Sequence, residues 1–198
     1  MKNITFIKNF QMKPNHIKPA QGKLLISEPF LNDFYFKKSV ILLAEHNEEG
    51  SFGFIINKPL EVKAYDLLKE FVDFEPKIYL GGPVKTDTIY AIHSLENKIP
   101  DSKKIINGLY WGGNVEVIFE LIANKKISTN DICFYIGYSG WSANQLNNEL
   151  KEKSWIVMNP TLDQILTKKP ENLWSDILKT LGSDYAIWAN PPLNPALN

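Results

Sequence analysis

The segment CFYIGYSGWSANQLNNEL (Cys133–Leu150) constrains the fold of this chain more than any other stretch of its length. The apolar run Ile132–Ile136 stops at Gly137, and a second glycine follows three residues later. Glycine supplies the positive φ of tight turns, and a helix start offers unpaired N–H donors. The spacing therefore predicts a strand, a turn and a helix in direct succession. The helix would open at Ser142, which forms with Gln145 the S-x-x-Q spacing of a capping box.

The length of the chain favours a single folding unit. Its 198 residues are 44% apolar and 22% charged, which is enough to fill one core, and no repeat or low-complexity tract divides them. We expect one mixed α and β domain over residues 1–198. Residues 1–21 would form an extended leader and residues 183–198 a proline-rich tail.

The charge balance argues against nucleic acid as a partner. The 22 basic residues equal the 22 acidic ones, and all the basic residues are lysine. Arginine is the preferred residue for bidentate contacts to guanine and phosphate, so its absence lowers the expectation of DNA reading. No apolar run is long enough to span a bilayer, and no signal-peptide core follows Lys2 and Lys8. We expect a cytoplasmic protein with no membrane partner.

Apolar periodicity predicts the remaining elements. In chain order they are strands at 40–45 and 51–56 joined as a hairpin, strands at 77–80 and 88–92, a charged surface loop at 97–107, a helix opening at Asn114, a strand at 155–158, and a last helix through Trp174 that ends at Gly182. The run at 40–45 is almost continuously apolar, which is typical of a strand covered on both faces.

No catalytic constellation can be assembled from the sequence. The turn around Ser139 resembles the nucleophile elbow of serine hydrolases, but that pattern needs glycine where this chain has Trp141. It also needs a histidine after the serine, and the last histidine is His93. Cys133 lies in an apolar run, as buried and inert thiols commonly do. We therefore predict no catalytic residue.

Neither a metal nor a cofactor is predicted. The histidines His16, His46 and His93 are scattered, although the last two would converge if their strands were neighbours. The pairs Gly81-Gly82 and Gly112-Gly113 lack the spacing of phosphate-binding loops, and ordinary turn geometry explains them.

Four sequence segments and a final pair of residues occur in a specific order along the chain. They are GKLLISEPFLNDFYFKKSV (Gly22–Val40), LLAEHNEEGSFGFIINKPL (Leu42–Leu60), YLGGPV (Tyr79–Val84), GYSGWSANQLNNEL (Gly137–Leu150), and the closing Trp174 and Gly182. In this combination the chain resembles the AlgH/YqgE family of bacterial proteins from about Gly22 to Gly182.

The resemblance implies a fold but no reaction. It implies a single α+β domain whose bifurcated mixed sheet curls into a partial barrel, with helices packed outside. Some members of that family are labelled transcriptional regulators, and no helix-turn-helix, zinc module or basic stripe supports that label here. The family supplies no catalytic residues. Relatives commonly have arginine where this chain has Lys38, and lysine is the poorer bidentate grip on an anion.

Three functions remain open from the sequence. The first is a non-enzymatic protein that acts through a protein or ligand contact, with any effect on transcription indirect. The second is a small-molecule or nucleotide binder, or an enzyme, with its site near the GGPV and GYSGW segments. The third, rated lowest, is a direct DNA-binding regulator. The residues predicted for a ligand site are Lys38, His46, Asn57, Ser139, Trp141 and Gln145.

Overall fold

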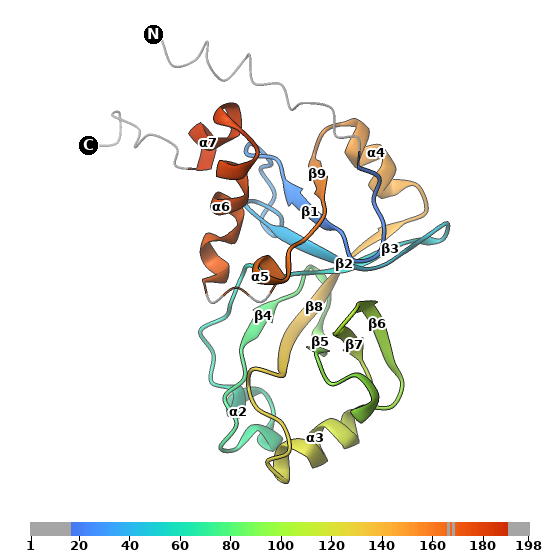
Figure 1. Ribbon diagram of the computed structural model, residues 1–198, viewed down its shortest axis with the longest axis vertical. Coiled ribbons are helices and arrows are strands. Elements are labelled where there is room, and N and C mark those ends of the chain that lie inside the picture. Colours follow the sequence, from blue (N-terminus) through green and yellow to red (C-terminus); the bar gives the residue numbers. More distant parts are fainter. Residues whose placement is uncertain (1–16, 166, 168, 190–198) are drawn as a thin grey trace, which may run out of the picture.

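A computed structural model of the chain describes residues 17–165, 167 and 169–189. Residues 1–16, with His16, and residues 190–198 lie outside the described part. The described chain folds around one open sheet with helices on its outside (Figure 1).

The elements follow one another along the chain as strands and short helices. The strands are β1 (Leu24–Ser27), β2 (Val40–Asn47), β3 (Gly50–Ile55), β4 (Ile78–Leu80), β5 (Val84–His93), β6 (Ser102–Ile106), β7 (Leu109–Gly112), β8 (Ile132–Ser142) and β9 (Trp155–Met158). The helices are α2 (Ala64–Leu67), α3 (Val115–Ala123), α4 (Gln145–Lys151), α5 (Leu162–Ile165), α6 (Leu173–Thr180) and α7 (Ser183–Ala189), with 3-10 turns η1 (Lys69–Phe71), η2 (Glu96–Lys98) and η3 (Pro170–Asn172). Within the described residues, none of these helices has the length and apolarity to cross a membrane.

The sheet branches at β8. The strand order is β6-β7-β5-β8-β3-β2-β1-β9, and β4 pairs with β8 off this path. The first half of β8 lies between antiparallel β5 and parallel β4, whereas its last residues pair with β3. The open sheet curls, so that Lys103 on β6 reaches Glu45 on β2 with Nζ 2.9 Å from the carboxylate oxygen. The predicted bifurcated mixed sheet is confirmed.

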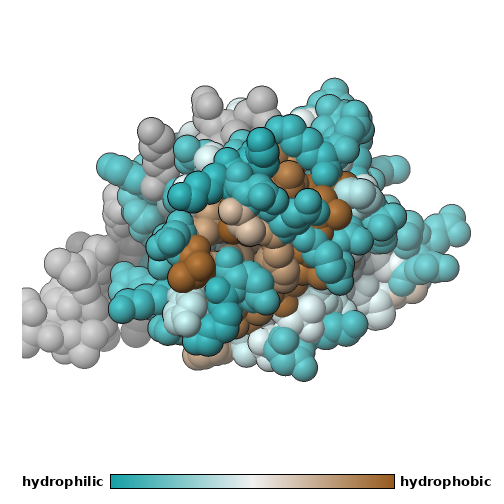
Figure 2. Space-filling view, turned by 90° about the horizontal axis from the view of Figure 1, so that it is seen from below, coloured by the Kyte–Doolittle hydropathy of each residue, from teal (hydrophilic) through white to brown (hydrophobic). Residues whose placement is uncertain are grey.

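Each face of the sheet has its own helical cover. Along β1, Leu24 and Ile26 pack with α6 and α7, while Leu25 between them packs with α4. This alternation follows from the two-residue period of a strand and explains the continuously apolar sequences of β1 and β2. A third cluster joins η1 and α3 to the first half of β8. The end of the molecule formed by α2, η1 and α3 leaves some apolar surface exposed (Figure 2).

The predicted hairpin and helices are present, but the predicted loop at 97–107 is wrong. The β2–β3 hairpin, α3, β9 and α6 lie where their periodicity placed them. Part of 97–107 forms β6, which pairs with β7 at one edge of the sheet. Its lysines Lys103 and Lys104 are exposed while Ile105 enters the core. Lysine is a common residue on edge strands, so a charged sequence concealed a strand.

The predicted turn after Ile136 is also wrong, because β8 runs through both glycines to Ser142. Gly137 has φ of +68°, and there the register between β5 and β8 shifts, so the glycine bends the strand without ending it. The helix α4 begins only at Gln145. Its side-chain oxygen accepts from the backbone N–H of Ser142 at 3.0 Å, which is half of the predicted capping box.

The helical structure continues beyond Gly182. That residue has φ of +118° and directly follows the last turn of α6, as its sequence position predicts. Residues 183–189 then form α7, whose Tyr185 and Ala189 are buried in the core, and residues 190–198 of the predicted proline-rich tail lie outside the described part.

Asn114 caps α3, and its removal supplies a test of the helix. Its side-chain oxygen accepts from the Val117 backbone N–H at 3.0 Å. Replacing Asn114 with alanine leaves this donor without its partner and should lower the free energy of unfolding by about 1 kcal/mol. Asn114→Asp keeps an acceptor and should stay close to the wild type. Urea denaturation of the three proteins measures both effects, and equal losses in the two variants would contradict the capping role.

Candidate functional site

Two of the six residues predicted for a ligand site, Lys38 and Asn57, lie beside the start of β2. Asn57 is 5% exposed, and its amide accepts from the Val40 N–H at 2.7 Å and donates to the Lys38 carbonyl at 2.9 Å. The Lys38 ammonium lies over the ring of Trp174, 5.7 Å from its centroid. Asn57 is therefore occupied in holding two chain segments together.

Ser139 is fully buried where the glycine segment after β4 lies against β8. Its hydroxyl donates to the Gly81 carbonyl at 3.1 Å. A Cβ atom built on Gly81 would lie 2.2 Å from the Gly137 carbonyl oxygen, so the two backbones are in direct contact. The glycine pair at 81–82 thus permits the chain after β4 to lie close against β8, and the Gly81 N–H already donates to the Ile136 carbonyl, so it is not open to receive an anion.

The remaining three predicted residues gather where the β2–β3 hairpin meets α4. The carboxylate of Glu149 connects this region: one oxygen accepts from the indole N–H groups of Trp141 at 2.8 Å and Trp155 at 2.7 Å. The other oxygen accepts from the Gln145 amide at 3.0 Å. Gln145 in turn holds the Ser142 backbone. His46 lies on β2, directly opposite Ser51.

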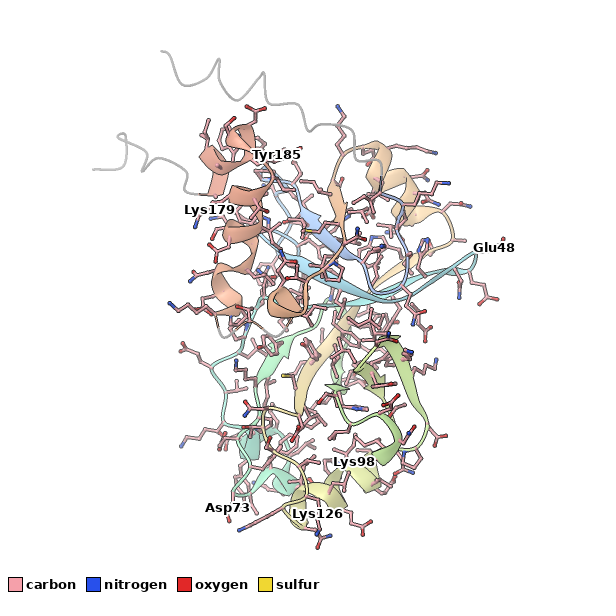
Figure 3. The ribbon with its side chains drawn as sticks, viewed as in Figure 1. Glu48, Asp73, Lys98, Lys126, Lys179 and Tyr185 are labelled. Carbon is pink, nitrogen blue, oxygen red and sulfur yellow. The ribbon has the colours of Figure 1, made fainter. Side chains whose placement is uncertain are left out.

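A polar hollow of about 570 Å³ lies between the hairpin and α4, and we call it the α4 cleft. Its lining consists of His46, Asn47, Glu48, Gly50, Ser51, Ser142, Asn144, Leu146 and Asn147. Figure 3 shows Glu48 at the far end of the hairpin, and this residue is part of the lining. Two lining residues, Gly50 on β3 and Ser142 on β8, are directly paired across the sheet.

A second hollow of about 450 Å³, the aromatic cleft, adjoins the first and shares Asn47, Gly50, Ser51 and Ser142 with it. Phe52 and Tyr138 line it, with ring centroids 4.7 Å apart. Tyr90 packs against both rings. Burial, with Tyr138 and Asp87 nearby, raises the pKa of the Tyr90 phenol.

The Ser51–His46 pair is the nearest approach to a catalytic group. The serine oxygen lies 2.7 Å from His46 Nδ1. In the described part of the chain, no carboxylate bonds to the imidazole to orient it, and Ser51 is 8% exposed. A cross-strand hydrogen bond between directly paired residues accounts for this contact.

The other titratable candidates lie apart. His93 is on β5, which does not neighbour β2, so it does not meet His46. Its Nε2 is 3.0 Å from the Ser102 hydroxyl, and burial lowers its pKa. Burial raises the pKa of the Cys133 thiol, which disfavours the reactive thiolate. Among the described residues no group of histidine, cysteine or carboxylate side chains could hold a metal ion.

Sequence reasoning missed the asparagines of the α4 cleft. Asn144 immediately precedes α4, Asn147 lies on α4 and Asn47 lies on the hairpin, and nothing in their separate positions indicates that they line one hollow. The one available signal was the asparagine-rich run NQLNN immediately after Ala143.

Comparison with known proteins gives a consistent result. A family model described as AlgH-like matches residues 24–186. A UPF0301 protein of Parabacteroides distasonis is 44% identical over 191 residues, 96% of each chain, and one of Cytophaga hutchinsonii is 40% identical over 90% of this chain and 99% of its own.

Two solved structures share the fold. The solution structure of the AlgH protein from Pseudomonas aeruginosa has a TM-score of 0.68 and 26% identity, and the match covers 92% of this chain and 100% of that one. A crystal structure of a Corynebacterium diphtheriae protein has a TM-score of 0.72 at 20% identity, over 90% of this chain and 95% of that one, and shows the fold alone.

Proposed function

The chain belongs to the AlgH-like family, and from its α4 cleft we propose that it is a cytoplasmic, non-enzymatic binding protein for a small polar ligand. Any effect on transcription would then be indirect, through the bound state. The cytoplasmic assignment rests on the single cysteine, which cannot form an internal disulfide.

The observation that carries the proposal is the chemistry of the α4 cleft. The side chains of Asn47, Asn144 and Asn147 all line it. The Asn47 amide oxygen already accepts from the Glu49 and Gly50 N–H groups at 2.9 and 3.2 Å, so Asn47 offers its amide N–H donors, whereas Asn144 and Asn147 offer both donors and acceptors. His46 adds an imidazole, and the volume of about 570 Å³ is within the usual range for small-ligand sites. Such a lining fits a ligand rich in amide or hydroxyl groups.

The same lining argues against a nucleotide. Apart from the imidazole of His46, Glu48 is the only ionisable residue in the lining, and the lining contains no lysine. A carboxylate without a nearby cation repels the phosphates of a nucleotide, so that part of the small-molecule alternative is less favoured. A small neutral ligand or one with an amino group suits the cleft better.

A matched pair of asparagines on α4 tests the site. Asn147 lines the cleft, whereas its neighbour Asn148 does not. A thermal-shift screen of dipeptides, sugars, polyols and nucleotides should find stabilising compounds among the neutral or amine-bearing classes, since ligand binding raises apparent stability. For such a compound, Asn147→Ala should weaken calorimetric affinity about fivefold, the value of one neutral hydrogen bond, and Asn148→Ala should leave it unchanged.

Three outcomes would count against the proposal. They are equal affinities of the two asparagine variants, stabilisation by nucleotides alone, and a screen with no stabilising compound. Retardation of duplex DNA that falls steeply with salt would instead favour the regulator alternative.

A further inference from the structure

We propose that a groove beside α3 docks an amphipathic helix of a partner protein that carries lysine or arginine next to its apolar face. This α3 groove is a hollow of about 850 Å³ between the segment after η1 and the C-terminal end of α3. It is lined by Glu70, Val72, Asp73, Phe74, Phe119, Glu120, Ile122, Ala123, Lys125, Ile127, Ser128 and Thr129. Figure 3 places Asp73 well away from Glu48 at the hairpin end, so the groove is separate from the α4 cleft.

The apolar part of the groove is more exposed than the core requires. Phe71 is fully buried, and its ring packs on Phe134 with centroids 4.7 Å apart. The next residue, Val72, is 61% exposed and contributes nothing to that packing. Phe119 on α3 is only half-buried. Figure 2 shows apolar surface at this end surrounded by hydrophilic residues, the usual appearance of an interaction site.

Charge around the groove selects the partner. Its lining holds the carboxylates of Glu70, Asp73 and Glu120 against one ammonium, that of Lys125. In the part of the chain that the structure describes, none of these carboxylates takes part in an ion pair. A negative border around apolar surface attracts basic side chains and repels anionic lipid, so the complementary partner is a basic protein segment rather than a membrane.

The surrounding backbone favours a helix over an added strand. β4 follows the lining residue Phe74 along the chain, and the edge of β4 that faces away from β8 is already used: the Leu60 N–H donates to the Ile78 carbonyl at 2.8 Å, and the Leu80 N–H donates to the Lys58 carbonyl at 2.9 Å. An extended peptide would find no strand edge to pair with there. A helix needs only side-chain anchors, which the hollow can receive.

Fluorescence anisotropy with model peptides tests the inference. The probes are a labelled helical peptide with leucine at i, i+3, i+4 and i+7 and lysine elsewhere, its glutamate counterpart, and a scrambled leucine–lysine peptide. We expect the basic amphipathic peptide to bind at least tenfold more tightly than the other two, with an affinity that falls as salt rises. Val72→Asp should weaken binding of the basic peptide at least tenfold, and Val62→Asp, at a 44% exposed valine outside the groove, should leave it unchanged.

Reversing the charge of two carboxylates that line the groove provides an independent test. The double variant Asp73→Lys, Glu120→Lys should transfer the preference to the glutamate peptide. Equal binding to the Val72 and Val62 variants, or equal binding of the scrambled peptide, would overturn the proposal. So would self-association of the wild type in sedimentation that is lost in Val72→Asp and in Phe34→Ser, because a second copy, through the 88% exposed Phe34, would then be the occupant.

Discussion

Replacement of Glu149 with alanine is expected to lower the free energy of unfolding by about 2–4 kcal/mol, because two buried indoles lose their shared acceptor. Trp141 is 5% exposed and Trp155 is 2% exposed, so water cannot readily take over from the carboxylate. Their N–H groups donate to one Glu149 oxygen at 2.8 and 2.7 Å. The change also releases Gln145, so we expect α4 to loosen from the end of β8.

Two variants separate the hydrogen bonds from the charge and from the helix. Glu149→Gln keeps an acceptor oxygen and should lose less than half as much stability as the alanine variant. Glu152→Ala removes an exposed carboxylate near the same helix end and should change little. Chemical denaturation followed by tryptophan fluorescence measures all three. A loss in Glu149→Gln as large as in Glu149→Ala would attribute the effect to charge and contradict the acceptor role.

Much of the fold could be predicted because its signals are local. The continuous apolar sequence of β2 and the turn residues after it are sufficient to predict the β2–β3 hairpin. The capping residue Asn114 and the helical periodicity of the apolar residues after it likewise predict α3. In these elements the local preference and the tertiary structure agree, which is the usual condition for a reliable prediction.

The failures occur where tertiary contacts decide. Gly137 and Gly140 normally indicate a turn, but pairing with β5 and β3 keeps β8 extended through both. The lysines of β6 indicate a loop until Ile105 is seen to enter the core. Local sequence cannot show either effect, because the deciding partners are distant in the chain.

Only part of the candidate site could be predicted from the sequence. The family blocks led to His46, Trp141 and Gln145, which lie around the hairpin end and α4. They led equally to Asn57 and Ser139, which are buried and bonded to backbone. Membership of a family segment does not show what each residue does. The structure distinguishes the residues that hydrogen-bond the backbone from those that line a hollow.

Replacement of Gly81 with alanine is expected to disrupt the branch point of the sheet. The new Cβ would lie 2.2 Å from the Gly137 carbonyl oxygen and 3.1 Å from the Tyr135 Cβ, and neither backbone can withdraw without breaking strand pairing. The Gly81 N–H donates to the Ile136 carbonyl at 2.8 Å, and its carbonyl accepts from the Ile55 N–H at 2.9 Å. We expect a loss of about 3 kcal/mol or more, at the upper end for overpacking.

Gly108 provides the matched control, because its substitution tests a positive φ without steric crowding. Its φ is +77°, but a Cβ there would meet nothing within 4 Å. Gly108→Ala should therefore lose only about 1 kcal/mol through backbone strain. Urea unfolding of both variants compares crowding with strain directly. If the two losses were equal, the close contact between Gly81 and β8 would not be the constraint, and the glycines of the branch point would need another explanation.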